Sequence, residues 1–454
     1  QDIFITVLAH TCLTPMGSGQ ATNMSANSEI IPSTGKALTH LQMVPNTLVN
    51  FIMVWHTVKA HISMLMAVDT SAIGKTTTHL MRGEVDAACK IAEAWWLKYA
   101  KGAEYPQLVL DTLEQLKGMQ PKTTESVSYG EKLSSVLVAS YLEKVHGKST
   151  MPLWADNHRI VKATFTGNPF EASVVAVDRT GIELFLGKGI IPVITGYIGF
   201  DDTNSTVLLG RDGSDISAVA IANVLGCNCT IVTDVPGIMS ADPRIVKDPR
   251  PITYIHIDEA RELAFHGASV LNRYTLNHIR DGMIIEVVYN TGTGTMITHD
   301  TVDRSGPIAV ALLRERRIIT VRRIGKGKTG FSSLVFGNVS KIGVSVEMIM
   351  QTCSETSVSF VVPETVALEC QKALRSIGRT TISEPMCVAT VVGMGMVMNM
   401  GVLATLASTL SESGINIRGV SQGSEELSIS FCVENGRADD AVRALHSVIV
   451  RRWL

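Results

Sequence analysis

An internal repeat in the last third of the sequence most constrains how this chain folds. Residues 343–362 and 414–433 follow one pattern, in which Gly-x-x-[Val/Ile] opens each copy, a glutamine follows, and Ser-x-Ser-Phe-x-Val closes it. A pair of glycines precedes each copy, at positions 325 and 327 and at positions 393 and 395. Each copy is typical of a strand, a helix, two strands and a second helix, and tandem copies of one such unit usually pack on each other. We therefore predict two βαββαβ units in tandem.

The residues before the repeat alternate between strand-length apolar runs and helical apolar spacing. Strands are predicted at 62–68, 190–195, 229–233 and 284–288, and helices at 46–61, 111–119, 131–145, 214–225 and 258–266. Such alternation predicts an α/β fold of three layers, with a mostly parallel sheet covered by helices on both faces. Ligands of such sheets bind beyond the carboxyl ends of the strands, so polar motifs that follow strands are the candidate sites.

Composition excludes several functional classes. The 454 residues are 45% hydrophobic and 18% charged with a formal net charge of −2, which is typical of a globular protein and gives no reason to expect a nucleic acid or a membrane surface as partner. No apolar run reaches the length of about 18 residues that spans a bilayer. Of the eight cysteines only Cys227 and Cys229 are close together, without the second pair that a zinc site needs.

The first 35 residues contain no lysine or arginine and show no usable periodicity. The lack of basic residues argues against an intact secretory or transit peptide. We expect an extension of unknown role on a cytoplasmic protein, or on a plastid protein if the source is a photosynthetic eukaryote.

The run Gly210-Arg211-Asp212-Gly213-Ser214-Asp215 lies between a strand near Val207 and the helix predicted at 214–225. Glycine lets backbone N–H groups approach an anion, and a helix N-terminus adds partial positive charge. Arg211 can hold a carboxylate or phosphate with two hydrogen bonds, and Asp215 can orient a lysine or a magnesium ion. The alternative interpretation is a capped helix start with surface charges.

A second cluster directly follows the strand predicted at 229–233. Thr233-Asp234-Val235-Pro236-Gly237-Ile238 leads to Asp242-Pro243-Arg244. Thr233 and Asp234 can bond the base and ribose of a nucleotide, and Arg244 can reach its phosphates. The alternative is a turn closed by proline and glycine.

Two further clusters precede these along the chain. Ser128-Tyr129-Gly130-Glu131-Lys132-Leu133-Ser134-Ser135 is predicted to place Glu131 at a helix start, where its carboxylate can accept a substrate ammonium or merely complement the helix dipole. The loop predicted at 71–77, Ser-Ala-Ile-Gly-Lys-Thr-Thr, nearly matches a Walker A motif. Asp69 stands where that motif requires its first glycine, which argues against a P-loop.

These four clusters, in this order, resemble the motifs of aspartate kinases in the amino-acid kinase family. The resemblance runs from about residue 36 to the end, and the repeat resembles paired, ferredoxin-like ACT domains. It implies an N-terminal extension at 1–35, a catalytic domain at 36–298 and a regulatory domain at 299–454. It also implies transfer of the ATP γ-phosphoryl group to the side-chain carboxylate of L-aspartate with Mg²⁺, the first step of lysine, threonine and methionine synthesis. An allosteric lysine or threonine would inhibit it, in a homodimer or a dimer of dimers.

The resemblance also assigns roles to residues. The catalytic residues are Lys36, Glu131 and Asp215, and no side chain is assigned as a metal ligand. Aspartate would contact Ser71, Ala72, Thr77, Glu131, Arg211 and Ser214. The nucleotide would contact Thr233, Asp234, Met239, Arg244 and Ser269. The effector would contact Glu347, Gln351, Ser354 and Glu355 in the first copy and Asn416, Gln422 and Glu425 in the second, although these residues could instead satisfy backbone groups at turns.

The chain departs from the family pattern around the phosphates. The family motif Lys-Phe-Gly-Gly-Thr-Ser aligns with residues 36–41, where Lys36 remains and both glycines are replaced. A competing register at 7–9 loses the lysine as well. Asp212 replaces a glycine, Met239 an aromatic residue and Ser269 a lysine. Two alternatives to a working aspartate kinase therefore stay open: a weak or inactive kinase-fold protein that binds an effector, and a kinase of another small amino acid.

Overall fold

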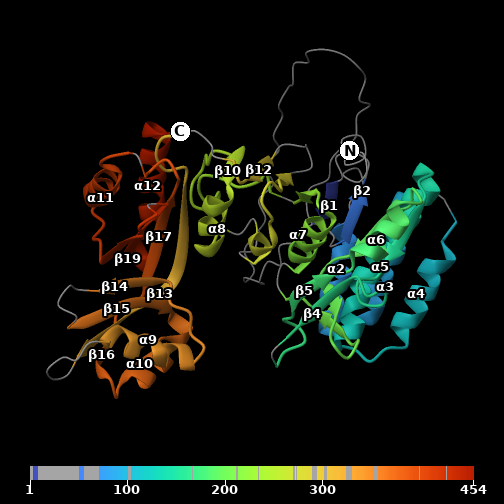
Figure 1. The fold of residues 1–454 in the computed structure, drawn as a ribbon, viewed down its shortest axis with the longest axis horizontal. Helices are drawn as coiled ribbons and strands as arrows, with labels where there is room; N and C mark the ends of the chain where they lie inside the picture. The colour runs from blue at the N-terminus through green and yellow to red at the C-terminus, as the bar shows by residue number, and fades with distance from the viewer. Residues whose placement is uncertain are drawn as a thin grey trace, which may run out of the picture. The chain divides into compact units, whose positions relative to one another are not determined.

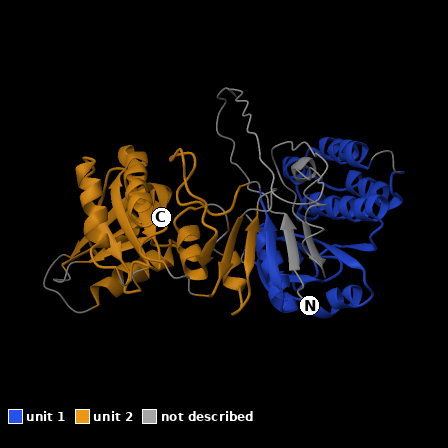
Figure 2. Ribbon diagram, turned by 90° about the horizontal axis from the view of Figure 1, so that it is seen from above, with its two compact units in different colours: residues 1–234 blue, residues 235–454 orange. Residues whose placement is uncertain are grey.

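The computed structural model describes much of the chain from residue 71 onward and two short strands before it (Figure 1). The described residues are 4–8, 51–55, 71–100, 104–165, 167–210, 213–233, 235–268, 271, 274–288, 294–300, 304–323, 330–351, 356–397, 399–425 and 427–454, with side chains from 76 onward. Contacts divide the chain into two compact units, 1–234 and 235–454 (Figure 2). The division falls inside the predicted catalytic domain, because residues 235–298 cluster with the repeats.

Unit 1 contains a mixed sheet. Its strands are β1 (Phe4–Leu8), β2 (Phe51–Trp55), β3 (Thr150–Leu153), β6 (Ile191–Thr195) and β9 (Asn228–Val232), in the order β9-β1-β2-β6-β3. The pairs β1–β9 and β3–β6 are parallel, whereas β2 is antiparallel to both of its neighbours. A smaller sheet has the order β5-β4-β7-β8, from β4 (Val161–Thr164), β5 (Ser173–Val177), β7 (Ile198–Phe200) and β8 (Thr206–Leu208).

The long helix α5 (Thr124–His146) is the centre of unit 1. Thr123 caps it in a capping box with Ser126, and Gly147 ends it in the left-handed conformation. Its residues 126–142 are all buried, because it contacts β3 and β6 as well as α2 (Ser71–Arg82), α3 (Val85–Tyr99) and α4 (Gln107–Lys117). The remaining helices of the unit are α6 (Arg179–Leu186) and α7 (Gly213–Leu225).

Three sequence predictions in this unit were wrong. The helix predicted at 46–61 contains strand β2, since Phe-Ile-Met-Val-Trp favours a strand and pairs with β1 and β6. The loop predicted at 71–77 forms the first turns of α2. The helix predicted at 131–145 begins at Thr124, where the capping box lies. The other predicted helices and strands are confirmed, except the strand at 62–68, which lies outside the described residues.

Unit 2 begins with three paired strands and one helix. Strand β12 (Gly294–Thr298) pairs in parallel with β10 (Tyr254–His256) and antiparallel with β11 (Ile285–Val288). Helix α8 (Ile257–Phe265) follows β10, and a 3₁₀ turn, η1 (Thr275–His278), precedes β11.

The repeat forms one sheet that shares a strand between its copies. The first copy contains α9 (Phe331–Lys341), β14 (Met348–Gln351), β15 (Ser357–Pro363), α10 (Glu364–Leu374) and β16 (Gly378–Ile382). The second contains β17 (Met386–Val392), α11 (Val402–Glu412), β18 (Gly419–Gln422), β19 (Ser428–Glu434), η2 (Asn435–Arg437) and α12 (Ala438–Arg452). The long strand β13 (Ala309–Arg323) pairs through its first part with β17 and through its second part with β15 and β16. The second copy therefore takes a strand from upstream of the first copy.

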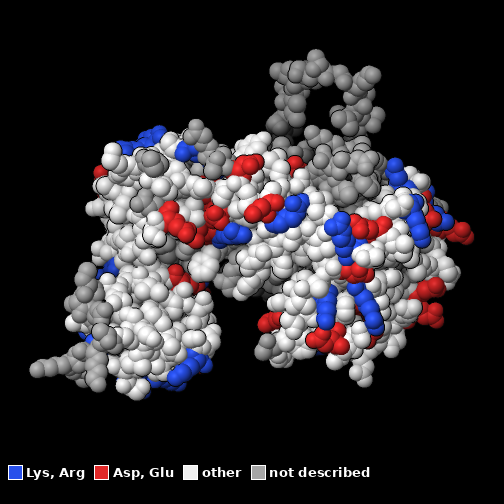
Figure 3. Space-filling view, viewed as in Figure 1, with Lys and Arg blue, Asp and Glu red and all other residues white. Residues whose placement is uncertain are grey.

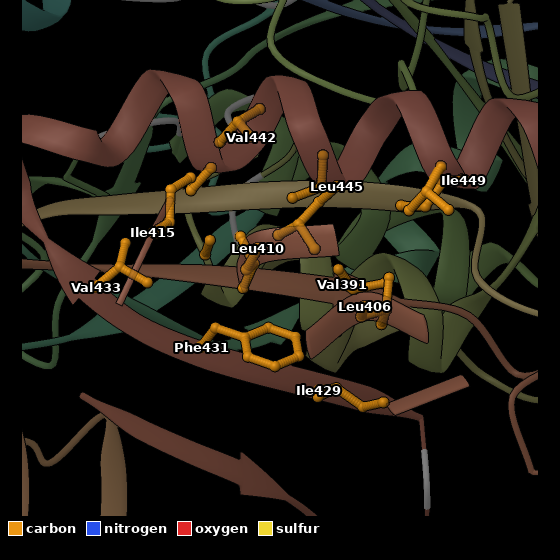
Figure 4. Close-up of a cluster of buried hydrophobic side chains, with 14 of the residues drawn as sticks. Val391, Leu406, Leu410, Ile415, Ile429, Phe431, Val433, Val442, Leu445 and Ile449 are labelled. Carbon is orange, nitrogen blue, oxygen red and sulfur yellow. The ribbon is translucent and has the colours of Figure 1, made fainter. Parts of the chain in front are cut away.

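Each copy has its own apolar core. In the second, Leu406 and Leu410 of α11 and Leu445 and Ile449 of α12 pack on β17 and β19, with Phe431 among them (Figure 4). The first copy buries Phe360 and residues of α9 and α10 in the same way. The repeated apolar spacing in the sequence therefore corresponds to the buried face of each copy.

Charges of both signs are interspersed on the surface. Acidic and basic side chains alternate over the face shown in Figure 3, without a large field of one sign. Among the described residues, no helix is both long and apolar enough to cross a bilayer. The described cysteines are buried free thiols, and no group of three potential metal ligands occurs in this part of the chain.

Candidate functional site

Glu131 lies where α2 crosses α5. Thr77 Oγ1 donates a hydrogen bond to Glu131 Oε1 at 3.1 Å, and the Glu131 side chain is almost fully buried. Gly130 permits this close crossing, because a Cβ there would lie only 2.1 Å from Thr77 Oγ1. The prediction that Glu131 starts a helix was wrong, since α5 begins at Thr124. Helix packing, rather than a helix terminus, places this carboxylate.

The turn after β6 meets the start of α7. Tyr197 is buried with φ of 65°, in the left-handed region. A Cβ on Gly196 would lie 3.0 Å from Ser214 Cβ, so glycine lets this turn approach α7 closely. Ser214 Oγ is buried and makes no hydrogen bond to any described residue, and Asp215 beside it is also buried. The first turn of α7 thus presents a buried hydroxyl, a carboxylate and a helix N-terminus together.

The segment predicted to handle phosphate begins at Gly196, but neither Gly196 nor Tyr197 was predicted to have a role of its own. The signal that could have found them is a Thr-Gly pair at the carboxyl end of a buried strand, the place where parallel sheets bind ligands. Thr195 also links two strand ends, because its Oγ1 accepts a hydrogen bond from Ala155 N at 2.8 Å.

A buried ion pair holds α5 in place. Lys132 Nζ lies 2.8 Å from Asp156 Oδ2, with both side chains at least 96% buried. The rings of Tyr129 and Trp154 stand 4.9 and 5.3 Å from the ammonium. Thr206 donates a further hydrogen bond to Asp156 Oδ2 at 2.8 Å. Lys132 directly follows Glu131, so the Lys132–Asp156 pair holds α5 in place beside Glu131, whose carboxylate is predicted to bind the substrate.

The predicted nucleotide residues are divided between the units. Thr233 is buried just after β9 in unit 1. Met239 and Arg244 belong to unit 2, where the exposed Arg244 guanidinium bonds both carboxylate oxygens of Asp242, through Nη2 at 2.7 Å and Nε at 3.0 and 3.1 Å. Burial raises the pKa of Asp242, but the hydrogen bonds and charge of Arg244, with the charge of Arg314, outweigh it and leave that pKa below its ordinary value.

Two predicted effector residues of the first copy, Glu347 and Gln351, lie at the two ends of β14. Glu347 Oε2 is 2.5 Å from Arg316 Nε, and both side chains are largely buried. Gln351 Oε1 accepts a hydrogen bond from Ser332 Oγ at 2.7 Å. In the second copy, Asn416, Gln422 and Glu425 are exposed around β18. The Glu347 carboxylate is thus already paired with Arg316. A cationic effector that bound Glu347 would have to displace the Arg316 guanidinium.

Several predicted site residues fall outside the described part of the chain. Those with no described position are Lys36, Arg211, Asp212, Asp234, Ser269, Ser354 and Glu355, and Ser71 and Ala72 are described only as the first turn of α2. Strand β1 (Phe4–Leu8) pairs in parallel with β9, so the competing register at 7–9 begins on a described strand, whereas residues 36–41 lie outside the described residues.

Two family models match the chain. The amino acid kinase family matches residues 58–288, and an ACT domain matches residues 324–378 and 390–449. Aspartokinase from Helicobacter pylori strain ATCC 700392 is 31% identical over 341 residues, which cover 71% of this chain and 82% of the relative. Aspartokinase 1, chloroplastic, from Arabidopsis thaliana is 29% identical over 420 residues, covering 83% and 73% of the two chains.

Solved structures of an aspartokinase have a similar fold. The chain is similar to E. coli aspartokinase III in complex with aspartate and ADP, with a TM-score of 0.70 at 24% identity, covering 86% of this chain and 96% of that one. It is also similar to the same enzyme in complex with lysine and aspartate, with a TM-score of 0.61 at 25% identity, covering 83% and 90%.

Proposed function

The chain belongs to the amino acid kinase family, among the aspartokinases, and from this premise we propose that it transfers the γ-phosphoryl group of ATP to the side-chain carboxylate of L-aspartate. The observation that carries the proposal is the buried Glu131 carboxylate, oriented by Thr77 at the α2–α5 crossing. The ammonium of an amino acid is a strong charged hydrogen-bond donor to a carboxylate held in such surroundings. The proposed catalytic domain is 36–298 and the regulatory domain 299–454.

The residues of unit 1 can position both reactants. Glu131, oriented by Thr77, holds the ammonium of aspartate, and we assign the α-carboxylate to Arg211. Ser214 and Asp215 open α7, whose N-terminal partial charge and N–H groups favour the transferred phosphoryl group. A carboxylate oxygen of aspartate attacks the γ-phosphorus while the bond to the β–γ bridging oxygen breaks and ADP leaves. Because the nucleophile is already ionised, catalysis needs positioning and charge neutralisation rather than a general base.

Magnesium fits this site as a companion of the nucleotide. Mg²⁺ is commonly held by one or two carboxylates together with substrate phosphates, and the buried Asp215 at the start of α7 supplies one carboxylate. When bound, the ion neutralises the charge of the phosphates. On the nucleotide side we assign Thr233, Asp234, Met239, Arg244 and Ser269.

Regulation and assembly follow from the same premise. We propose that an end-product amino acid, lysine or threonine, binds the ACT copies and inhibits the kinase in a homodimer or dimer of dimers. The similarity to an aspartokinase in complex with lysine supports an amino acid as effector. The proposed compartment is the cytoplasm, or the plastid if the source is a photosynthetic eukaryote.

A coupled assay of ADP release with ATP, Mg²⁺ and L-aspartate tests the proposal. We expect ADP release that depends on aspartate and that falls sharply in the Glu131→Gln variant, which keeps the side-chain shape and removes the charge. Turnover no higher than in Glu131→Gln would contradict the proposal. Turnover with another acceptor in a panel of small amino acids would instead indicate a different substrate, and effector binding without any turnover a non-catalytic protein.

A further inference from the structure

The segment 239–250, which carries Met239 and Arg244, is seated on the second ACT copy. It runs from Met239 to Arg250 as a closed loop, because Ser240 N donates to Arg250 O at 2.8 Å and Met239 pairs with Pro251. Ala241 is buried in the apolar core of the second copy, the cluster that holds Leu445 and Ile449 of α12 (Figure 4). Ile245 and Val246 pack against the same cluster. The loop is therefore anchored in the core of the second ACT copy, a domain to which the proposed function assigns no nucleotide contact.

Ser240 connects the loop to this domain through polar contacts. Its carbonyl oxygen accepts a hydrogen bond from Val310 N on β13 at 2.9 Å. Its Oγ accepts one from Arg250 N at 2.7 Å and lies 2.8 Å from Nε2 of His446 on α12. Oγ carries one proton and two lone pairs, so it can donate to Nε2 of a neutral His446 while it accepts from Arg250 N. Ser240 and His446 are both buried, so neither has water as an alternative partner.

Two further hydrogen bonds join the same loop to α12 and to Leu454, two residues beyond its end. Arg443 Nε donates to Ile245 O at 3.1 Å, and Arg250 Nη1 donates to Leu454 O at 2.6 Å. These two lie at the exposed edge, whereas the Ser240–His446 contact lies in the buried centre. A buried hydrogen bond is costly to leave unmade, so the central contact adds to the apolar packing that holds the loop in place.

We propose that Ser240 and His446 are positioning residues for nucleotide binding, and that α12 of the second ACT copy sets the nucleotide affinity of the kinase through them. The proposal rests on the proposed function, because it requires Met239 and Arg244 to contact the nucleotide. The side chain of Ser240 faces the ACT core and its chain neighbour Met239 carries the nucleotide role. A displacement of α12 therefore moves the nucleotide loop directly.

The test measures the dissociation constant of Mg·ADP by calorimetry on the full chain, with KM for ATP and kcat measured in parallel. Ser240→Ala and His446→Leu remove the contact, while His446→Gln keeps an acceptor near the position of Nε2. Thr320→Val is the matched control, because it removes the 2.9 Å hydrogen bond to Ser359 between β13 and β15 in the first copy, away from the loop.

We expect Ser240→Ala and His446→Leu to weaken ADP binding and raise KM for ATP about fivefold, the effect of one lost hydrogen bond, with kcat at saturating ATP within about twofold. His446→Gln and Thr320→Val should bind ADP as the wild type does. Equal ADP affinity in wild type, Ser240→Ala and His446→Leu would overturn the proposal, as would an equal loss in Thr320→Val.

The two proposals fail in different ways. A wild type that binds ADP without phosphorylating aspartate would contradict the proposed function, while the variants would still decide the positioning role. A wild type that binds no ADP would overturn both. If Ser240→Ala does not fold, the comparison of His446→Leu with His446→Gln gives the same decision.

Discussion

Thr77 donates a hydrogen bond to Glu131 across the crossing of α2 and α5, over an Oγ1–Oε1 distance of 3.1 Å. Because this bond orients the carboxylate assigned to the aspartate ammonium, the two side chains should differ in their effect. Glu131→Gln should raise KM for aspartate about 10- to 100-fold, since a hydrogen bond to a charged group contributes about 1.5–3 kcal/mol. Thr77→Val should raise it only about fivefold, as expected for one neutral donor. Steady-state kinetics with varied aspartate measure both.

The comparison has an internal control in the second substrate. KM for ATP should stay within about twofold in both variants, because neither side chain is assigned to the nucleotide. An equal rise in both KM values would indicate a disturbed fold instead of a lost ammonium site.

Gly130 should not tolerate a side chain. A Cβ at this position would lie 2.1 Å from Thr77 Oγ1 and 2.7 Å from its Cα, and the backbone atom cannot rotate away. We expect Gly130→Ala to lower the free energy of unfolding by about 1–3 kcal/mol through overpacking.

Gly337 in α9 is the matched control, because a Cβ added there would meet no atom within 4 Å. Gly337→Ala should stabilise by about 0.5–1 kcal/mol through helix propensity. Denaturant titration that ranks the two variants in the opposite order would contradict the crossing.

Much of this architecture could be predicted from local patterns in the sequence. The repeat predicted the order of helices and strands in both ACT copies, because the apolar residues of each copy are spaced to form one buried face. The shared strand β13 was not predictable, since its pairing with β15, β16 and β17 is decided by tertiary contacts and leaves no periodicity.

The site was predicted less well than the fold, for physical reasons that differ among residues. Glu131 was found by motif, but its setting was mistaken, because the capping box at Thr123 lies upstream of the motif. Lys132 looks like a surface residue in sequence and becomes buried only when Asp156 meets it. Ser240 and His446 are 206 residues apart, and no local rule connects them.

The Lys132–Asp156 pair predicts an unusual order of stabilities. Asp156→Ala leaves a buried ammonium without its carboxylate, which typically costs about 3–5 kcal/mol. Adding Lys132→Met removes that charge, so the double variant should be more stable than Asp156→Ala alone. Denaturant unfolding of the wild type, both single variants and the double variant forms a complete cycle. A double variant less stable than Asp156→Ala would show that the ion pair is not the reason for the burial of Lys132.

The buried His446 predicts a loss of stability in acid. Burial, followed by the charge of Arg250, lowers the pKa of His446 in the folded chain below its ordinary value. The unfolded chain therefore binds a proton at a higher pH than the folded chain does, and the free energy of unfolding falls as the pH drops through about 6.5. Burial also lowers the pKa of His278, so the pH dependence of the wild type alone cannot be assigned to His446.

The variant His446→Gln separates the two histidines, because it keeps an acceptor for Ser240 and never becomes charged. Its melting temperature should match that of the wild type near pH 8 and exceed it near pH 5. The corresponding gain in the free energy of unfolding is at most about 1.4 kcal/mol for each unit by which the pKa of His446 differs between the folded and unfolded chain. Parallel curves of melting temperature against pH for the two proteins would show that His446 does not titrate on unfolding.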